Sequence, residues 1–314
     1  MRVISGINEL DNAGLTNVVT TLGSFDGVHA GHQRIIATLH DFARDRKLPA
    51  VLLTFHPHPQ LVLGNRGPTE LLTTLEEKLQ LLERSGVENV VILDFNRQLA
   101  SFPPENFVRE VLLGKMGMKA LVIGYDHAFG KDRSGNKELL EKMSRTDNFD
   151  FYVVPEFKIN NQAVKSTIIR ELLKTGEYEL ALRALGYNYF LSGKIIRGHG
   201  IGKSLGFPTV NLAIPSGKLL PKEGVYSALA HFDGTVYHGM AYIGARLTFG
   251  DAAISVEMNL FDFKGEIKSD HGVLEMTGYI RPPERFKTPG ELADRMKQDE
   301  IEIRQKFLNK EAVS

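Results

Sequence analysis

The spacing of apolar residues divides the chain into two halves near residue 186. In the first half, short apolar runs alternate with segments whose apolar residues recur every three or four positions, which is the period of an amphipathic helix. The apolar runs are residues 18–23, 50–55, 87–95, 119–125 and 149–155. Strands that alternate with helices form mostly parallel sheets covered on both faces, so this half is predicted to be an α/β Rossmann-like domain.

One predicted helix of the first half has a clear start signal. Thr74 and Glu77 have the spacing of a capping box. In the helix that follows, the residues predicted to point inward are Leu75, Leu79 and Leu82. The helical segment 166–186 is assigned to this half as well, which gives a first domain over residues 1–186.

The second half changes to strand after strand. Five apolar runs, at 190–198, 225–232, 235–244, 254–263 and 273–280, are separated by turn signals that include Asp233-Gly234 and Lys264-Gly265. Regular short strands predict a small antiparallel β-barrel over residues 187–314. A C-terminal helix follows, and its predicted buried stripe consists of Leu292, Met296, Ile303 and Phe307.

Composition narrows the classes of function. Basic and acidic residues number 38 each, so the formal net charge is zero, whereas nucleic-acid binding usually needs a basic surface. The absence of cysteine excludes disulfides, thiolate zinc sites and cysteine nucleophiles. No apolar stretch approaches the roughly 18 residues of a membrane-spanning helix, and the first residues lack a signal-peptide core. We therefore expect a cytoplasmic protein without nucleic-acid or membrane partners; the sequence does not indicate an oligomeric state.

A glycine-rich turn, GSFDGVHAGH from Gly23 to His32, joins the first predicted strand to the first helix. Doubly wound sheets bind phosphates at this position, because glycines let the backbone approach them and the helix N-terminus favours negative charge. His29 and His32 lie three residues apart, so both imidazoles can point at one site. There they can stabilise charge on a reacting phosphate without a covalent nucleophile. The alternative is a pair of incidental surface histidines.

This turn resembles the G-x-F-D-G-x-H-x-G-H signature of nucleotidyltransferases. The resemblance implies that His29 and His32 are catalytic. It also implies that the nucleotide is bound by Gly23, Phe25, Asp26 and Gly31.

The segment STIIR, residues 166–170, resembles the ISSTxIR motif of the same family. The nucleotide-binding residues that this implies are Ser166, Thr167 and Arg170. Ser166 also fits a plain helix N-cap. The chain departs from the motif at Lys165, where serine is usual, and at Ala163, where arginine is frequent.

The segment 124–136 resembles the part of prokaryotic FAD synthetases that helps hold nucleotide and flavin. The resemblance implies that Asp126 is a polar anchor for the nucleotide, whereas Phe129 is expected to pack against its neighbours.

In the second half, GHGIGKSLGFPTVN contains GFPTVN, residues 206–211, which resembles the GFPTxN signature of riboflavin kinases. Thr209 and Asn211 lie two apart on an extended segment, so they point the same way, and their hard oxygens suit Mg²⁺ held together with ATP phosphates. The resemblance implies nucleotide binding by Gly198, Gly202, Gly206 and Pro208.

The segment 254–263 resembles the kinase strand that carries the catalytic glutamate, which implies that Glu257 is the general base. Its neighbours Val256 and Met258 should face the other side of the sheet and pack. The alternative is a glutamate on an exposed face. The RFK segment matches a part of the family around the flavin, which implies flavin binding by Arg285 and Phe286.

Taken over the whole chain, both signatures resemble the prokaryotic bifunctional riboflavin kinase/FAD synthetase family in the expected order. The resemblance implies phosphorylation of riboflavin to FMN and adenylylation of FMN to FAD, with ATP as the other substrate and Mg²⁺ as cofactor. Two alternatives stay open. One is a riboflavin kinase whose first domain binds nucleotide without reacting, and the other is a flavin sensor without turnover.

Overall fold

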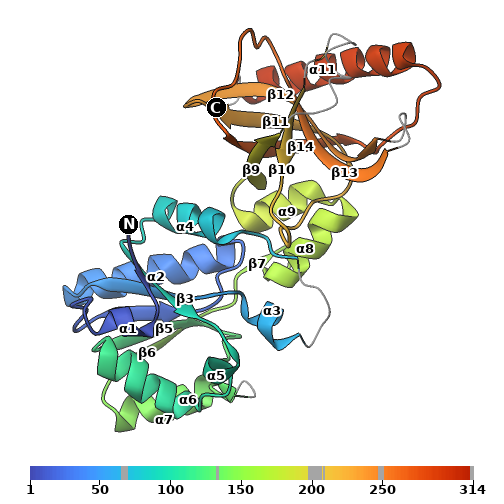
Figure 1. Ribbon diagram of the computed structural model, residues 1–314. Coiled ribbons are helices and arrows are strands. Elements are labelled where there is room, and N and C mark those ends of the chain that lie inside the picture. The colour runs from blue at the N-terminus through green and yellow to red at the C-terminus, as the bar shows by residue number, and fades with distance from the viewer. Residues whose placement is uncertain (65–69, 132–133, 197–206, 208, 247–250, 312–314) are drawn as a thin grey trace. The chain divides into compact units, whose positions relative to one another are not determined.

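The protein is described from a computed structural model that covers residues 1–64, 70–131, 134–196, 207, 209–246 and 251–311. The chain forms two compact units, Met1–Ser166 and Thr167–Ser314. Each unit is described by itself (Figure 1).

The first unit is built on a six-stranded sheet with the order β1-β4-β3-β2-β5-β6, in which every neighbouring pair is parallel. The strands are β1 (Arg2–Ser5), β2 (Val19–Leu22), β3 (Ala50–His56), β4 (Asn89–Asp94), β5 (Ala120–Gly124) and β6 (Asp150–Val154). The predicted Rossmann-like architecture is confirmed. The edge strand β1 was not predicted, because a run of four residues is too short to show a period.

Helices cover both faces of this sheet. Helix α2 (Ala30–Arg46) and helix α4 (Leu75–Arg84) lie on one face, and α7 (Lys137–Thr146) lies on the other (Figure 1). After β4, a short α6 (Pro104–Asn106) continues into a π-helix, η1 (Phe107–Lys115). Buried side chains of η1 and α7 pack against the strands in one core cluster. The shorter elements are α1 (Ile7–Leu10), α3 (Pro59–Leu63), α5 (Arg97–Ala100), β7 (Lys158–Ile159) and β8 (Gln162–Ala163).

Helix α4 has the predicted capping box between Thr74 and Glu77, but its inward face differs from the prediction. Leu82 is buried as expected, together with Glu77 and Lys78. Leu75 and Leu79 are only half-buried. Charged side chains occupy buried positions because they have polar partners inside the unit, which are described below.

The second unit begins with helices α8 (Ser166–Thr175) and α9 (Tyr178–Leu185) and continues into a closed antiparallel barrel of order β10-β13-β12-β11-β14-β9. The strands are β9 (Phe190–Ile196), β10 (Thr209–Ala213), β11 (Gly224–Phe232), β12 (Thr235–Arg246), β13 (Asp251–Leu260) and β14 (His271–Arg281). This confirms the predicted barrel. Asp233 and Gly234 turn β11 into β12 with φ angles of 50° and 74°, as their hairpin signal predicted.

The division into compact units falls earlier than the boundary predicted at 186/187, because α8 and α9 pack with the barrel. The Tyr178 hydroxyl donates to the Met276 carbonyl at 3.0 Å. The backbone N–H of Lys222 donates to the Leu173 carbonyl at 2.8 Å. These polar contacts fasten the helices to the barrel, the first to β14 and the second to the segment before β11.

Helix α11 (Pro289–Glu311) closes the barrel unit. Ile303 and Phe307 are buried in a cluster with barrel residues, and Met296 packs against the same cluster. The predicted stripe is therefore confirmed in its main part. Asp299, which is fully buried on the same helix, pairs with Arg281 at 2.7 Å. Within the described part of the chain, no helix is both long and apolar enough to cross a membrane.

Candidate active sites

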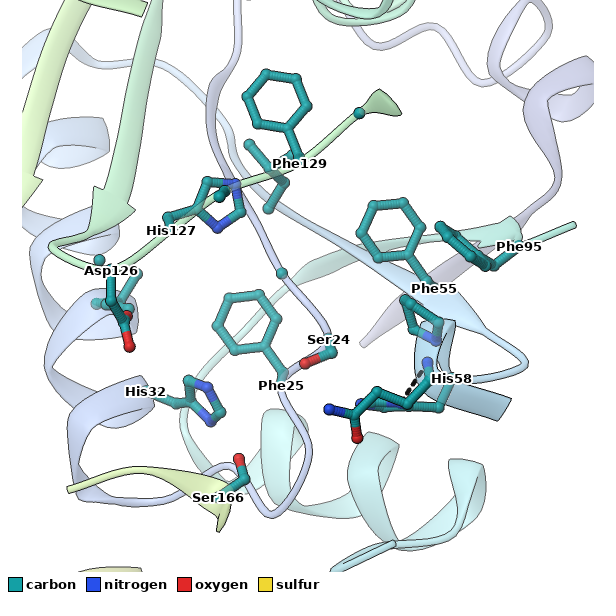
Figure 2. Close-up of a pocket in the computed structure, with 18 of the residues that line it drawn as sticks. Ser24, Phe25, His32, Phe55, His58, Phe95, Asp126, His127, Phe129 and Ser166 are labelled. Atoms are coloured by element: carbon teal, nitrogen blue, oxygen red, sulfur yellow. Dashed lines mark hydrogen bonds between the residues drawn. The ribbon is translucent and has the colours of Figure 1, made fainter. Parts of the chain in front are cut away.

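A cavity of about 1010 Å³ opens in the first unit beside the carboxyl ends of β2, β3 and β5. Its lining includes the chain segments that follow these strands, namely Gly23–Phe25 and Tyr125–Lys131. Open α/β sheets bind ligands at the carboxyl ends of their strands. Figure 2 shows His32, Asp126 and Ser166 on one side of this cavity and Phe55 and Phe95 on the other.

The glycine-rich turn takes a conformation that most side chains disfavour. Phe25 and Val28 have φ angles of 48° and 35°, and Gly27 has 80°. A β-branched residue at positive φ is strained, and such a conformation persists only where the surroundings hold it. Glycine is favoured at position 31 for another reason, because a Cβ there would lie only 3.2 Å from the His29 ring and would make the ring shift.

The two histidines of the turn lie face to face. Their ring centroids are 3.6 Å apart and their planes differ by 16°. His29 is the N-cap of α2, and its Nδ1 accepts a hydrogen bond from the backbone N–H of His32 at 3.3 Å. Helix formation therefore places both imidazoles at the positive end of α2, as the spacing predicted.

His32 is held in its neutral form. Burial, the neighbouring His29 and the charge of Lys78 together keep the pKa of His32 well below its ordinary value of 6.5. Its Nδ1 is buried and has no hydrogen-bond partner within the described parts of the chain. A buried polar atom without a partner costs free energy unless a ligand or water satisfies it, so the ring is arranged to interact with a bound group.

Most predicted residues of this site line the cavity: Gly23, Phe25, His29, Gly31, His32, Asp126 and Ser166. Asp26 has a different place. Its carboxylate accepts hydrogen bonds from the backbone N–H groups of Leu72 and Thr73 at 3.2 and 3.1 Å. Asp26 thus fastens the turn to the segment that leads into α4.

Ser166 and Lys165 lie next to the glycine-rich turn and the cavity. The Ser166 hydroxyl donates to the Asp26 carbonyl at 3.0 Å. Lys165 lies 3.3 Å from the carboxylate of Asp126, and both side chains line the cavity. Thr167 and Arg170 follow Ser166 on α8 and belong to the second unit, so their predicted contact with the nucleotide stays a prediction.

Sequence analysis missed the aromatic side of the cavity. Besides Phe25 in the turn, six phenylalanines are among its described lining residues: Phe55, Phe95, Phe102, Phe107, Phe129 and Phe157. Phe55 and Phe95 meet edge to face at 5.5 Å, and Phe129 packs near Phe107 at 5.8 Å. These residues come from separate loops and strands, so no local sequence pattern could predict that their side chains lie together.

The charges around the cavity favour an anion. Among the described lining residues, the cationic side chains are Arg97, Lys131 and Lys165, and the one carboxylate is Asp126. A cavity with excess positive charge, a neutral His32 and an aromatic side suits a phosphorylated aromatic molecule.

The second unit brings the predicted kinase residues together. Glu257 on β13 lies directly opposite Asn211 on β10 in the antiparallel register. The Thr209 hydroxyl donates to one carboxylate oxygen of Glu257 at 3.5 Å, and the Ser255 hydroxyl donates to the other at 2.9 Å. Asn211 is buried. Hydroxyl, amide and carboxylate oxygens are hard ligands, so this group fits Mg²⁺.

Other predictions for this unit have mixed outcomes. Val256 and Met258 are buried, which confirms that they pack. Ser255 was not anticipated, although its position two residues before Glu257 on a strand puts both side chains on one face. Phe286 lies with its ring centre 5.9 Å from the guanidinium of Arg281, and Arg285 is exposed. Four predicted nucleotide-binding residues lie outside the described residues: Gly198, Gly202, Gly206 and Pro208.

Comparison with known proteins matches each unit to a family. The sequence pattern of FAD synthetase matches residues 11–168, and that of riboflavin kinase matches residues 185–307. The bifunctional riboflavin kinase/FMN adenylyltransferase of Bacillus subtilis is 34% identical over 299 residues, which cover 93% of each chain. The Escherichia coli K12 protein of the same description is 31% identical and covers 98% of each chain.

A solved structure has the same fold over nearly the whole chain. It is a crystal structure from Streptococcus pneumoniae described as a macrolide-efflux protein, with a TM-score of 0.85 and 28% identity over 97% of this chain and 99% of that one. Full-length similarity to the curated relatives, with both family patterns in order, establishes the membership. The chain belongs to the bifunctional riboflavin kinase/FMN adenylyltransferase family.

Proposed function

We propose that this chain makes flavin cofactors in two steps, each catalysed by one unit. The barrel unit transfers the γ-phosphoryl group of ATP to the ribityl 5′-hydroxyl of riboflavin and releases ADP. The sheet unit joins the AMP part of ATP to FMN and releases pyrophosphate. The observation that carries this proposal is the presence of both residue groups in separate units of a chain that matches bifunctional relatives along its length.

In the kinase step, Glu257 accepts the proton of the 5′-hydroxyl as that oxygen bonds to the γ-phosphorus. The hydrogen bonds from Ser255 and Thr209 hold the carboxylate in place. Thr209 and Asn211 would hold Mg²⁺, which neutralises charge on the ATP phosphates when it is bound. Nucleotide binding by Gly198, Gly202, Gly206 and Pro208 stays a prediction, and Arg285 with Phe286 would contact the flavin.

In the adenylyl step, a phosphate oxygen of FMN attacks the α-phosphorus of ATP and the bond to pyrophosphate breaks. His29 and His32 would donate hydrogen bonds to the oxygens that gain charge, at the N-terminus of α2. Positioning and charge stabilisation suffice for this chemistry, since no covalent intermediate is needed. Gly23 and Gly31 let the backbone approach the phosphates, and Ser166, Thr167 and Arg170 would bind the β- and γ-phosphates.

The aromatic side of the same cavity would receive the isoalloxazine ring of FMN. Flat aromatic ligands pack well on phenylalanine rings. Lys165 places a cation where the triphosphate would lie, next to Asp126. The substrates are small molecules of the cytoplasm. The formal net charge of zero argues against a nucleic-acid partner.

One incubation separates this proposal from its alternatives. Purified protein with riboflavin, ATP and Mg²⁺, resolved by chromatography, should yield both FMN and FAD. Formation of FMN alone would indicate a monofunctional riboflavin kinase, and formation of neither product would indicate a flavin sensor. A parallel incubation without Mg²⁺, with a chelator present, should yield neither product.

Two variants then assign each reaction to its unit. Glu257→Gln should form FMN roughly 10² to 10⁴ times more slowly, because it keeps the shape of the side chain but removes the base. The same variant should still convert supplied FMN to FAD. His32→Gln should show the opposite pattern, with FMN formed and little FAD. If either variant loses both activities while it stays folded, the assignment of one reaction to each unit is wrong.

A further inference from the structure

The side chain of Lys78 points into the interior of the first unit. It lies in the first turns of α4 and is 5% exposed. Lysine is almost never this buried unless it has partners, because removing its charge from water is costly. The leucine pattern of α4 predicted a different inward face, so contacts outside the helix must account for this position.

These partners are at the nucleotide turn. The Nζ of Lys78 donates to the Ser24 carbonyl at 2.8 Å and approaches the Thr54 hydroxyl at 3.4 Å. The Thr54 hydroxyl itself donates to the same Ser24 carbonyl at 3.2 Å. Ser24 lies in the turn and lines the cavity, and Thr54 is near the end of β3. Lys78 therefore joins the turn to the neighbouring strand.

The segment before α4 holds the turn at a second point. Thr73 donates its N–H to the Asp26 carboxylate, and its hydroxyl accepts from the Gly27 N–H at 3.1 Å. Phe25 lies between these two points and Val28 directly follows the second, and both have positive φ. Strain of that kind requires fixed surroundings, and the contacts of Lys78 and Thr73 provide them.

The ammonium group also contributes charge. Within the described lining, Lys78 is absent from the cavity wall, so it acts on a ligand through the turn and through its field. The ionisable groups that interact with its charge are Asp26 in the turn and His32 at the start of α2, and Glu77 precedes it on its own helix. A buried charge is poorly screened, so its effect on a phosphate beyond the turn is larger than at a surface.

We propose that Lys78 is a positioning residue for adenylyl transfer, which fixes the Ser24 end of the turn and supplies buried positive charge behind the site of the ATP triphosphate. The proposal rests on the proposed function of the first unit. The pH behaviour of the group offers a direct test. Burial lowers the pKa of Lys78 to about 8, while the attraction of Asp26 acts in the opposite direction. The charge is therefore present below about pH 8 and is lost above it.

The test compares wild type with Lys78→Met, Lys78→Arg and the control Arg84→Met. Arg84 is an exposed cation at the end of the same helix, so its removal changes the net charge equally. Initial rates of FAD formation from FMN, at varied ATP, give kcat/KM for ATP between about pH 7 and 9.5, where phosphates are largely ionised. FMN formation from riboflavin by the same preparations is the internal reference.

We expect Lys78→Met to lower kcat/KM for ATP roughly 10- to 100-fold at neutral pH, while its kinase rate stays within about threefold of wild type. Wild type should lose kcat/KM as the pH rises through about 8, and Lys78→Met should lack this decline. Lys78→Arg should recover most of the activity and keep it to higher pH, because arginine stays charged. Arg84→Met should behave like wild type.

The proposal is overturned if Lys78→Met matches wild type, if both show the same alkaline decline, or if Lys78→Arg is no better than Lys78→Met. If Lys78→Met does not fold, the profiles of wild type and Lys78→Arg alone decide, since equal declines contradict the proposal. A wild-type protein that forms no FAD refutes the function of the first unit instead. The two failures are therefore distinct.

Discussion

His29 and His32 are joined twice: their rings stack at 3.6 Å, and the backbone N–H of His32 donates to Nδ1 of His29. His29 therefore has two roles, as the N-cap of α2 and as a candidate donor to the α-phosphate. Substitutions at this position can separate the two, because an amide side chain also caps helices.

We predict that His29→Asn retains the stability of the first unit but loses FAD formation, by roughly a hundredfold if one donor is worth about 3 kcal/mol. His29→Ala should lose the activity to a similar extent and should cost about 1 kcal/mol of stability in addition. Urea unfolding together with rates of FAD formation measures both. If the asparagine variant is as active as wild type, His29 has only its capping role.

The depressed pKa of His32 makes the stability of the protein depend on pH. In the unfolded chain the His32 imidazole binds a proton near pH 6.5, whereas in the folded protein it binds one only at lower pH. The contribution of His32 is therefore complete above pH 6.5 and is lost as the pH falls toward the lower folded pKa.

We predict that the melting temperature of the first unit falls between about pH 7.5 and 5.5, and that it falls less in His32→Gln. The control is His271→Gln, since His271 is an exposed histidine of the other unit. Calorimetry at several pH values measures the difference. An unchanged slope in His32→Gln would mean that burial does not hold the ring neutral.

The sequence predicted those parts of the molecule whose cause is local. The five strands predicted for each unit, the capping box at Thr74 and the hairpin at Asp233 follow from residues close together in the chain, and they form as expected. Strands β1 and β10 were not among the predicted strands. The inward face of α4 was wrong because Lys78 is buried against Ser24, which is 54 residues away. No helical period includes such a partner.

The same reason explains what was found and missed in the sites. His29 and His32, or Thr209 and Asn211, lie within one motif, so their proximity could be predicted. The aromatic side of the cavity joins Phe55 to Phe95 and Phe107 to Phe129 across separate segments. Only the folded sheet brings these rings together.

In the kinase unit, we predict that Ser255→Ala lowers kcat for FMN formation roughly tenfold, because it removes a hydrogen bond to a charged group. The hydroxyl lies 2.9 Å from the Glu257 carboxylate. The KM for riboflavin should change little, and Ser255→Thr, which keeps the hydroxyl, should retain most activity. Steady-state rates measure these effects. An equal loss in both variants would indicate a packing effect.

In the adenylyl unit, we predict that Lys165→Ser lowers FAD formation several-fold, because it leaves the Asp126 carboxylate beside the triphosphate without its cation. A double-mutant cycle with Asp126→Asn identifies the cause. If Lys165 acts by neutralising Asp126, the double variant should be more active than Lys165→Ser alone. If Lys165 contacts phosphate directly, the two losses should add. An increase of activity in Lys165→Ser would show that this departure from the family motif is harmful.

The last prediction concerns the extent of the kinase unit. The sequence boundary implies that a fragment from Asn188 suffices, whereas the contacts imply that α8 and α9 are needed. A fragment from Asn188 lacks the hydrogen bond from Tyr178 to Met276 and the packing of the Tyr178 ring on Tyr226, whose centres are 5.4 Å apart.

We predict that the fragment 167–314 folds and phosphorylates riboflavin, and that 188–314 is less stable by several kcal/mol. Helix α9 buries Tyr178, Ala181, Ala184 and Leu185. A fully buried large apolar side chain contributes about 1.5–3 kcal/mol, so removal of the helix exposes a costly surface on the barrel. Urea midpoints of the two fragments, with kinase rates at low denaturant, measure the difference. Tyr178→Phe in the longer fragment should cost about 1–3 kcal/mol, because the buried Met276 carbonyl loses its donor. Equal midpoints for the two fragments would place the boundary at 186/187 after all.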